Sequence, residues 1–210
     1  MNVGKFLSLL TLTLLALLAL YTSPVSACSC LPAHPQTHFC SADYVVIVRV
    51  LRKSQRLVAN RIAYKVEIKK SYKMNRDAET MLKHGRILTS DSSASCGVNL
   101  ELGKLYVIAG RAPYLTLCNY VKEYLNMSVI ERRGFAGVYR KGCNCTIKPC
   151  FGDSCLKNRE TKSGCKWSPF AKCETEFSAC MPTNYTTLEG SISKCHWRRT
   201  PAYKACMADP

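Results

Sequence analysis

The chain has 210 residues, 14 of them cysteines, and a formal net charge of +16 at pH 7. This length suits one large or two small domains. The excess of lysine and arginine favours anionic partners such as sulfated glycosaminoglycans, cell surfaces or acidic proteins, although a basic surface without a dedicated ligand is an alternative. The export signal at the N-terminus argues against nuclear nucleic acid as a partner.

The first 27 residues have the order of a secretory signal peptide. Lys5 precedes an apolar run over 6–20, and the small residues Val25-Ser26-Ala27 follow, which predicts cleavage after Ala27. A membrane anchor is the alternative, but the apolar run is shorter than the roughly 20 residues that a spanning helix needs. Cleavage makes Cys28 the mature N-terminus, and the protein is then secreted into the extracellular space or matrix.

All 14 cysteines follow residue 27. Behind a signal peptide an even number of cysteines predicts disulfides, although the sequence alone does not fix their pairing. Zinc binding at the CxC and CxxxxC spacings is one alternative, but no quartet with zinc-finger spacing accompanies them. A secreted thiol oxidoreductase is another, and it would need a reactive pair, typically CxxC, which the sequence does not contain.

Runs of β-branched and aromatic residues predict strands in the first half of the chain. We expect a buried strand over 44–51 and a half-exposed strand over 62–69, where apolar and polar side chains alternate. Further strands are expected over 86–89, 105–109 and 114–117, a short helix or loop over 74–83, and a helix over 121–135. This order predicts a mainly β fold with helices, a five-stranded Greek-key barrel of the oligonucleotide/oligosaccharide-binding (OB) type.

The composition changes after Cys143. Apolar runs disappear and cysteines recur at short intervals, so this part needs disulfides in place of a large core. We expect an N-terminal domain over 28–143 and a small disulfide-stapled α+β domain over 144–210. Asn126, Asn144 and Asn184 begin N-glycosylation sequons, of which Asn144 is the least favourable because it lies between cysteines at the domain joint.

The mature N-terminus offers chemistry that an internal cysteine lacks. The amino group of Cys28 has an ordinary pKa of about 7.7–8.0 and loses its proton when a metal competes for the nitrogen. Together with the Cys28 carbonyl oxygen it can close a five-membered chelate ring. Zinc proteases keep one zinc position open for water, which a rigid chain end could displace. The alternative is that the CxC motif only tethers the N-terminus.

Seven segments of the chain match a known family in order: CSCLPAHPQT over 28–37, YKVEIK over 64–69, CG over 96–97, LYVIAG over 105–110, ERRGF over 131–135, CNCT over 143–146 and CKW over 165–167. The first segment is the most specific match, because its CxC must fall at the mature end. By these segments the chain resembles the tissue inhibitors of metalloproteinases over its mature length, as an insect-like member with 14 cysteines. The resemblance implies a netrin-like OB-barrel domain that inhibits, a C-terminal domain that modulates partner choice, and no enzymatic activity.

The resemblance also implies a ridge that enters the cleft of a zinc metalloproteinase, in a 1:1 complex with a matrix metalloproteinase or a related sheddase. Cys28 would bind the catalytic zinc of the target, and the inhibitor would have no cofactor of its own. Ser29 would enter the pocket beside the zinc, and Cys30, Leu31 and Pro32 would follow the primed side. The remaining contacts implied are Ser93, Ala94, Ser95 and Cys96 on the unprimed side, with Thr116 and Leu117 as support.

The disulfides of the family carry over to twelve of the 14 cysteines. They imply Cys28–Cys96, Cys30–Cys118, Cys40–Cys143, Cys145–Cys195, Cys150–Cys155 and Cys165–Cys180. Cys173 and Cys206 have no counterpart in the usual pattern of twelve. We predict that they pair with each other; one free and one intermolecular thiol is the alternative.

Basic residues gather on and beside the first two predicted strands. They predict a stripe that binds sulfated glycosaminoglycan through screened ion pairs, namely Arg49, Arg52, Lys53, Arg56, Lys65, Lys69 and Lys73. A netrin-like matrix- or heparin-binding module without protease inhibition is therefore the alternative function. We interpret His34 and His38 as structural, and Trp167 and Trp197 as side chains that cover disulfides.

Overall fold

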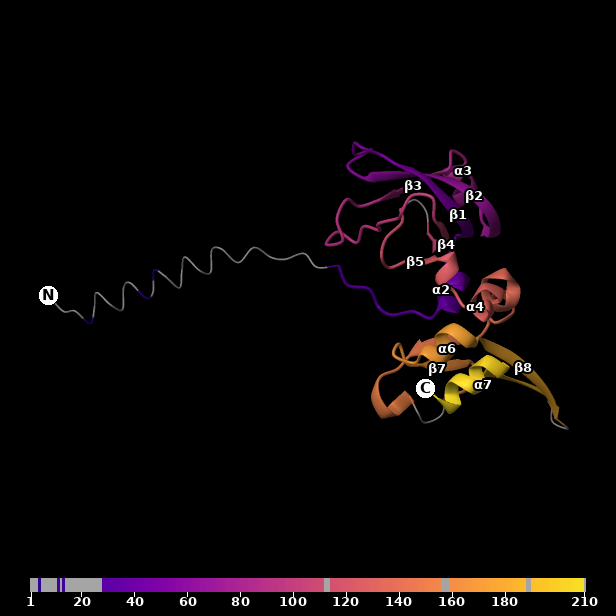
Figure 1. Ribbon diagram of the computed structural model, residues 1–210. Helices are drawn as coiled ribbons and strands as arrows, with labels where there is room; N and C mark the ends of the chain where they lie inside the picture. Colours follow the sequence, from indigo (N-terminus) through magenta and orange to yellow (C-terminus); the bar gives the residue numbers. More distant parts are fainter. Residues whose placement is uncertain are drawn as a thin grey trace.

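The computed structural model describes residues 28–111, 114–155, 159–187 and 190–209, together with Gly4, Thr11 and Thr13. The predicted signal peptide and its cleavage site after Ala27 lie outside the described residues, apart from these three. Within the described ranges no helix is both long and apolar enough to cross a membrane. Figure 1 shows the N-terminal sheet above a smaller group of C-terminal elements, with helix α2 (Pro35–Ser41) between them.

The N-terminal half forms one antiparallel sheet of five strands in the order β3-β2-β1-β4-β5. Register shifts between β1 and β2 bend the sheet, which curls into a half-barrel. A parallel bridge between Leu88 and Tyr114 joins β3 to the chain that precedes β5. The predicted fold class, an OB-type β unit followed by a disulfide-rich region with helices, is confirmed. The strands are β1 (Tyr44–Lys53), β2 (Ile62–Met74), β3 (Arg86–Thr89), β4 (Leu105–Gly110) and β5 (Tyr120–Glu123).

Strand β1 is buried on both faces, which explains its almost continuously apolar sequence. Val46 and Val48 pack into the core on one face of the sheet. Val45 and Ile47 pack on the opposite face, in a cluster that contains Ala179 from the C-terminal half. Residues from the N-terminal and C-terminal parts of the chain therefore pack together in one apolar cluster on this second face of β1.

The prediction of a strand over 114–117 is wrong. Within this segment the structure has only the single bridge at Tyr114, and the chain turns where Asn119 Oδ1 accepts a hydrogen bond from the Thr116 N–H at 2.8 Å. The fifth strand begins at Tyr120 and pairs with β4. Pairing with a neighbouring strand thus overrides the helical spacing of the sequence after Val121.

Short helical segments accompany the sheet. The region predicted as helix or loop over 74–83 contains a helix whose first turn is capped by Asn75. The helix predicted over 121–135 begins only after Ser128, whose Oγ accepts from the Glu131 N–H at 3.0 Å. These segments are α3 (Arg76–Leu82), the 3₁₀ turn η1 (Tyr124–Asn126), α4 (Val129–Arg133), the π-helical η2 (Gly134–Val138) and α5 (Tyr139–Lys141).

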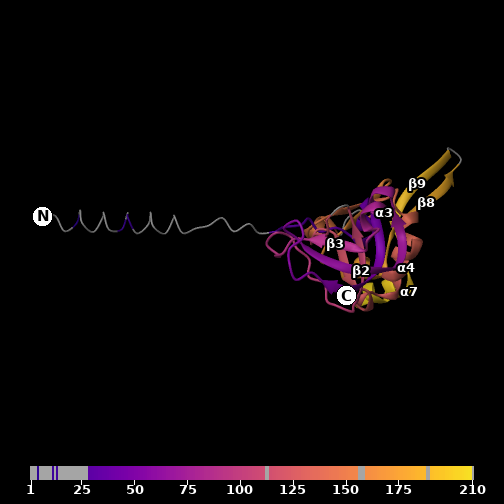
Figure 2. The same ribbon diagram turned by 90° about the horizontal axis from the view of Figure 1, so that it is seen from above.

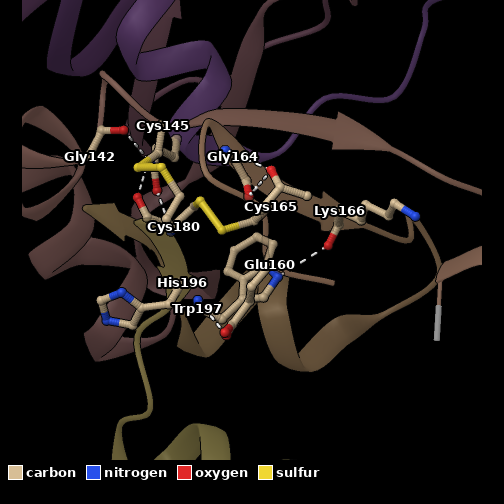
Figure 3. The surroundings of a disulfide bond; sticks show 12 residues. Gly142, Cys145, Glu160, Gly164, Cys165, Lys166, Cys180, His196 and Trp197 are labelled. Atoms are coloured by element: carbon tan, nitrogen blue, oxygen red, sulfur yellow. Dashed lines mark hydrogen bonds between the residues drawn. A yellow bond between two sulfur atoms is a disulfide. The ribbon is translucent and has the colours of Figure 1, made fainter. Parts of the chain in front are cut away.

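The C-terminal half is built around disulfides and two tryptophans. Trp167 and Trp197 lie in a buried cluster with Cys145, Cys165, Cys180 and Cys195, which confirms that they cover disulfides. Figure 3 shows Trp197 beside this cluster, with its Nε1 donating to the Lys166 carbonyl at 3.1 Å. The elements are the parallel pair β6 (Thr146–Pro149) and β7 (Gly164–Trp167), the hairpin β8 (Cys180–Thr187) and β9 (Gly190–Trp197), η3 (Gly152–Cys155), α6 (Lys172–Phe177) and α7 (Pro201–Ala208). Figure 2 shows the hairpin projecting beyond the rest of the molecule.

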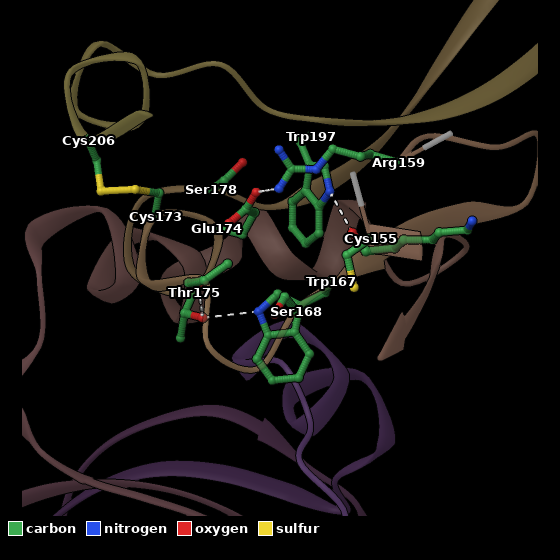
Figure 4. A network of polar contacts seen from close by, with 12 residues as sticks. Cys155, Arg159, Trp167, Ser168, Cys173, Glu174, Thr175, Ser178, Trp197 and Cys206 are labelled. Atoms are coloured by element: carbon green, nitrogen blue, oxygen red, sulfur yellow. Dashed lines mark hydrogen bonds and ion pairs between the residues drawn. A yellow bond between two sulfur atoms is a disulfide. The ribbon is translucent and has the colours of Figure 1, made fainter. Parts of the chain in front are cut away.

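All 14 cysteines are paired, and none is free. The additional pair Cys173–Cys206 joins α6 to α7, as Figure 4 shows. This pair agrees with our separate prediction, the other six pairs coincide with those that the resemblance implies, and no thiolate remains for zinc binding or for redox exchange. The other six are Cys28–Cys96, Cys30–Cys118, Cys40–Cys143, Cys145–Cys195, Cys150–Cys155 and Cys165–Cys180.

Candidate functional site

Two neighbouring disulfides hold the segment Cys28–Pro32 against two loops of the N-terminal half. Cys28 and Cys30 bond to Cys96 and Cys118, and the four sulfur atoms lie within 4.8 Å of one another. The segment is thus fixed at alternate residues. The side chains beside them are exposed, and Leu31 is 91% exposed. The two disulfides therefore hold this short segment in place while Ser29, Leu31 and Pro32 face outward.

The loop that carries Cys96 is built on Ser92. The Ser92 carbonyl accepts hydrogen bonds from the N–H groups of Ser95 at 3.2 Å and Gly97 at 2.8 Å. Cys96 has a φ of 61°, a left-handed conformation that costs free energy in a residue other than glycine. The turn and the disulfide hold it there. The predicted contact residues Ser93, Ala94 and Ser95 are exposed at the tip.

Gly97 is required by close backbone approach. A Cβ at this position would meet the backbone carbonyl oxygens of Ser90 and Ser92. These carbonyls belong to the turn itself, so neither can move without opening the loop. The CG pair at 96–97 is therefore a unit: the cysteine fixes the segment and the glycine permits the turn.

A third segment completes the surface. The Leu117 N–H donates to the Cys96 carbonyl at 2.9 Å, and the Leu117 side chain is 48% exposed. Asn119 Oδ1 accepts from both the N–H and the Oγ1 of Thr116, at 2.8 and 3.2 Å. We call residues 28–32, 93–96 and 116–117 the ridge. Sequence reasoning missed Asn119, which a turn motif with asparagine would have indicated.

The chain that leaves the ridge enters the core at His34 and Gln36, both buried. His34 Nδ1 accepts from the Gln36 N–H at 3.1 Å and caps α2, while Nε2 lies 3.0 Å from the Glu174 carbonyl oxygen. This pattern assigns the proton to Nε2 of a neutral ring. Burial, with a smaller effect of His38, lowers the pKa of His34 to about 3. The structural interpretation of His34 is confirmed.

Part of the predicted basic stripe forms one cleft. Arg52, Lys53, Arg56 and Lys65 line it together with Arg86. Arg86 lies on β3 and pairs with Lys65 across the sheet, a neighbour that the sequence did not reveal because the two strands are separated by α3. No acidic side chain is among the described residues that line this cleft.

The other predicted basic residues lie apart from this cleft. Lys69 forms an ion pair with Glu67 at 2.6 Å, and Arg49 donates weakly to the Gly103 carbonyl at 3.5 Å. Lys73 turns inward and donates to the carbonyls of Phe39 and Cys40 at 3.2 and 2.8 Å. Burial lowers the pKa of Lys73. The Lys73 ammonium group therefore binds backbone carbonyls of the protein itself and does not belong to the basic cleft.

The sequon asparagines lie on different elements. Asn126 and Asn144 are exposed, at the end of η1 and in the turn between two cysteines. The backbone of Asn184 belongs to β8. Exposure permits glycan attachment at the first two positions.

Comparison with known proteins gives a consistent result. The family model described as "Tissue inhibitor of metalloproteinase" matches residues 26–197. The chain is 54% identical over 210 residues to the "Tissue inhibitor of metalloproteinase" of Drosophila melanogaster, with 100% of both chains covered. It is 31% identical over 195 residues to "Metalloproteinase inhibitor 3" of Scyliorhinus torazame, with 90% of this chain and 89% of the relative covered. For "Metalloproteinase inhibitor 2" of Homo sapiens the identity is 30% over 203 residues, with the same shares covered. The similarity extends over the ridge and the C-terminal half alike.

Proposed function

Because the chain belongs to the tissue inhibitor of metalloproteinase family, whose members are protease inhibitors and not enzymes, we propose that it is a secreted inhibitor of zinc metalloproteinases. The observation that carries the proposal is the double clamp on the segment Cys28–Pro32. A mobile chain end would lose roughly 1–2 kcal/mol per ordered residue on binding. The clamp removes much of this cost in advance.

We infer that signal-peptide removal after Ala27 frees the amino group of Cys28. The amine nitrogen and the carbonyl oxygen of this residue then form a bidentate ligand for the zinc of the target protease. Nitrogen and oxygen donors suit zinc, and an open zinc position is the site of the catalytic water in such enzymes. Binding there removes the nucleophile, so the complex is inhibitory without cleavage of the inhibitor.

The rest of the ridge would contact the substrate cleft on both sides of the zinc. Ser29 is exposed next to Cys28 and would enter the adjoining pocket. Leu31 and Pro32 would follow the primed side, and the tip over 93–95 the unprimed side. Thr116 and Leu117 support this arrangement through the bond between Leu117 and Cys96. The matrix metalloproteinases and related sheddases are the target classes we propose.

We propose a division into an inhibitory domain over 28–143 and a disulfide-rich domain over 144–210. The five-stranded sheet and its helices end at Lys141, and Cys40–Cys143 closes this part. The next disulfide, Cys145–Cys195, lies entirely in the second part. This change from one disulfide set to the next supports a joint between Cys143 and Cys145.

The proposal is tested with the mature protein and with a variant that carries one additional alanine before Cys28. Both are assayed against purified catalytic domains of several zinc metalloproteinases, after N-terminal sequencing has established where each begins. We expect tight inhibition by the mature protein and loss of at least a hundredfold in the extended variant, because acylation removes the amine ligand. Equal potency of the two proteins would contradict zinc binding by Cys28.

A second function, binding to sulfated glycosaminoglycan of the extracellular matrix, is favoured by the basic cleft. Five cationic side chains line it, which suits a polyanion. The interaction would be sensitive to salt, because exposed ion pairs are screened within about 8–10 Å at physiological ionic strength. Elution from heparin resin well above physiological salt is expected, and elution near physiological salt would argue against this function.

A further inference from the structure

The chain immediately after the ridge is held by the C-terminal half of the molecule. Gln36 Nε2 donates to the carbonyls of Gly142 and Cys180 at 2.9 and 2.8 Å. Its Oε1 accepts from the Cys180 N–H at 2.8 Å. The His34 ring donates to the Glu174 carbonyl at 3.0 Å. All of these partner atoms belong to the backbone, that of Glu174 and Cys180 in the C-terminal half and that of Gly142 just before the joint, so the contact does not depend on mobile side chains.

His34 is also enclosed by aromatic rings. Its ring centroid lies 5.6 Å from that of Trp167 and 5.3 Å from that of Trp197, both in the C-terminal half. The ring of Tyr139 is 6.2 Å away. A fully buried imidazole with both nitrogens hydrogen-bonded and rings on several sides has no room to reorient. The backbone at His34 is therefore fixed in position and direction.

Helix α6, whose Glu174 carbonyl accepts the His34 hydrogen bond, is held by further contacts. Figure 4 shows Glu174 of α6 paired with Arg159, and the disulfide Cys173–Cys206 that ties α6 to α7. Trp167 Nε1 donates to Thr175 Oγ1 at 3.1 Å on the same helix. The family-atypical disulfide thus lies next to the residue that holds His34. The C-terminal half presents a rigid support to the chain that leaves the ridge.

We propose that the C-terminal half positions the inhibitory segment, and that His34 and Gln36 are the positioning residues through which it does so. This inference rests on the proposed function as a protease inhibitor. The disulfides fix the segment at Cys28 and Cys30, and the contacts of His34 and Gln36 fix it from the other side. Only Leu31, Pro32 and Ala33 lie between the two anchors. Loss of the second anchor leaves this end of the segment free to sample conformations that do not fit the cleft.

The alternative is that His34 merely caps α2, and two substitutions separate the roles. His34→Asn keeps a short side-chain oxygen for the Gln36 N–H, as a helix cap requires, but cannot reach the Glu174 carbonyl. His34→Gln retains a longer amide that can donate to Glu174 but is a poor cap. Gln36→Met keeps the volume of Gln36 and removes its hydrogen bonds to Gly142 and Cys180. Ser128→Ala is the matched control, because it breaks another bond between the halves, from Ser128 Oγ to the Glu176 carbonyl, away from the ridge.

The experiment measures association and dissociation rates of the full-length mature protein and these four variants with one metalloproteinase catalytic domain. Hydrogen exchange of residues 31–33 and thermal unfolding are measured in parallel. We expect Gln36→Met and His34→Asn to associate about tenfold more slowly, which corresponds to about 1.4 kcal/mol. The association rate falls tenfold when the conformation of residues 28–33 that fits the protease cleft is populated tenfold less. Exchange at Leu31 and Ala33 should accelerate, whereas Ser128→Ala should lower the unfolding temperature and leave the association rate unchanged.

The outcomes separate this inference from the function on which it rests. If the wild-type protein does not inhibit, the proposed function fails. If it inhibits and Gln36→Met and His34→Asn associate as fast as Ser128→Ala, the positioning role fails alone. If His34→Gln is slow and His34→Asn is fast, the helix cap and not the C-terminal half controls the segment. Should Gln36→Met fail to fold, the two His34 variants decide the question.

Discussion

The Leu117 N–H donates to the Cys96 carbonyl at 2.9 Å and so joins the two loops to which the N-terminal segment is bonded. Without this bond, Cys28 and Cys30 would be attached to two independent loops. With it, the three parts of the ridge form one surface. The strained backbone of Cys96, with a φ of 61°, lies at the centre of this arrangement. Substitutions that open the turn around Cys96 should therefore weaken inhibition, which an equally destabilising substitution elsewhere should not do.

Gly97→Ala tests that expectation. Its Cβ would collide with the carbonyl oxygens of Ser90 and Ser92 and open the turn. We expect inhibition to weaken at least tenfold, with a loss of about 1–3 kcal/mol in the free energy of unfolding. Gly103→Ala is the control: it is strained by a φ of +79° but has open space around its Cβ and lies outside the ridge. It should lower stability and leave the inhibition constant unchanged; an equal loss of inhibition in both variants would contradict the role of the turn.

Acid should destabilise the protein through His34. The folded state keeps this ring neutral down to a pKa of about 3, whereas the unfolded chain binds the proton near pH 6.5. The unfolded state therefore holds more protons between these values, and the free energy of unfolding falls as the pH decreases from about 6.5 to about 3. The slope for one proton is at most roughly 1.4 kcal/mol per pH unit. Below about pH 3 both states are protonated and the slope from this group disappears.

The measurement is urea unfolding at pH 7, 5 and 4 for the wild type and His34→Asn. His38 also has a pKa lowered by burial, so part of the slope remains in the variant. The difference between the two proteins isolates His34. Parallel pH profiles would show that His34 is not buried as a neutral ring.

Lys122 neutralises a buried carboxylate. Glu131 is 1% exposed and accepts from Lys122 Nζ at 2.9 Å and from the Tyr120 hydroxyl at 2.6 Å. Burial raises the pKa of Tyr120, and the charge of Glu131 adds to this effect. Lys122→Met should destabilise the fold by roughly 2 kcal/mol, less than a fully buried pair because Lys122 is partly exposed. Tyr120→Phe, which removes one neutral donor, should cost about 1 kcal/mol.

A second substitution checks the cause. In the Lys122→Met background, Glu131→Gln removes the uncompensated charge and should restore part of the lost stability. Denaturant midpoints of the single and double variants give the coupling between the two residues. Additive losses would mean that the pair does not interact.

Arg86→Glu should weaken heparin binding strongly, because Arg86 lies in the basic cleft opposite Lys65. Lys69→Glu makes the same change of charge at a residue that already pairs with Glu67 outside the cleft. We expect the salt concentration for elution from heparin to fall clearly for Arg86→Glu and only slightly for Lys69→Glu. Equal shifts would show that net charge, and not the cleft, governs binding. Inhibition of the protease should be the same in both variants.

The strands of the sheet could be predicted where the pattern of apolar side chains within one strand reveals its buried faces. The apolar run after Tyr44 predicts β1, and the alternation after Ile62 predicts β2. Each pattern reflects which faces of that single strand are buried. Strand β5 could not be placed in this way. Its four residues are a strand because β4 lies beside them, whereas the helix expected over 121–135 was suggested by the spacing of later residues, Leu125, Val129, Ile130 and Phe135.

The ridge was only partly predictable. The proposed chelating terminus was inferred from the expected signal peptide and the CxC motif, which are local. The neighbouring loops are 68 and 88 residues away from their disulfide partners, a separation that carries no local signal, so their place came from the family resemblance. Asn119, Arg86 and the contacts of Gln36 depend on the folded arrangement and were not predicted.

The order in which the cysteines are synthesised conflicts with the order in which they can pair. Cys28, Cys30 and Cys40 emerge first, yet their partners follow 68, 88 and 103 residues later. On the proposed secretory route these early thiols are synthesised before their native partners exist. Any bridge formed among them has to be opened by thiol–disulfide exchange before the native pairs can close, so we expect the clamp on the chain end to be among the last features to mature.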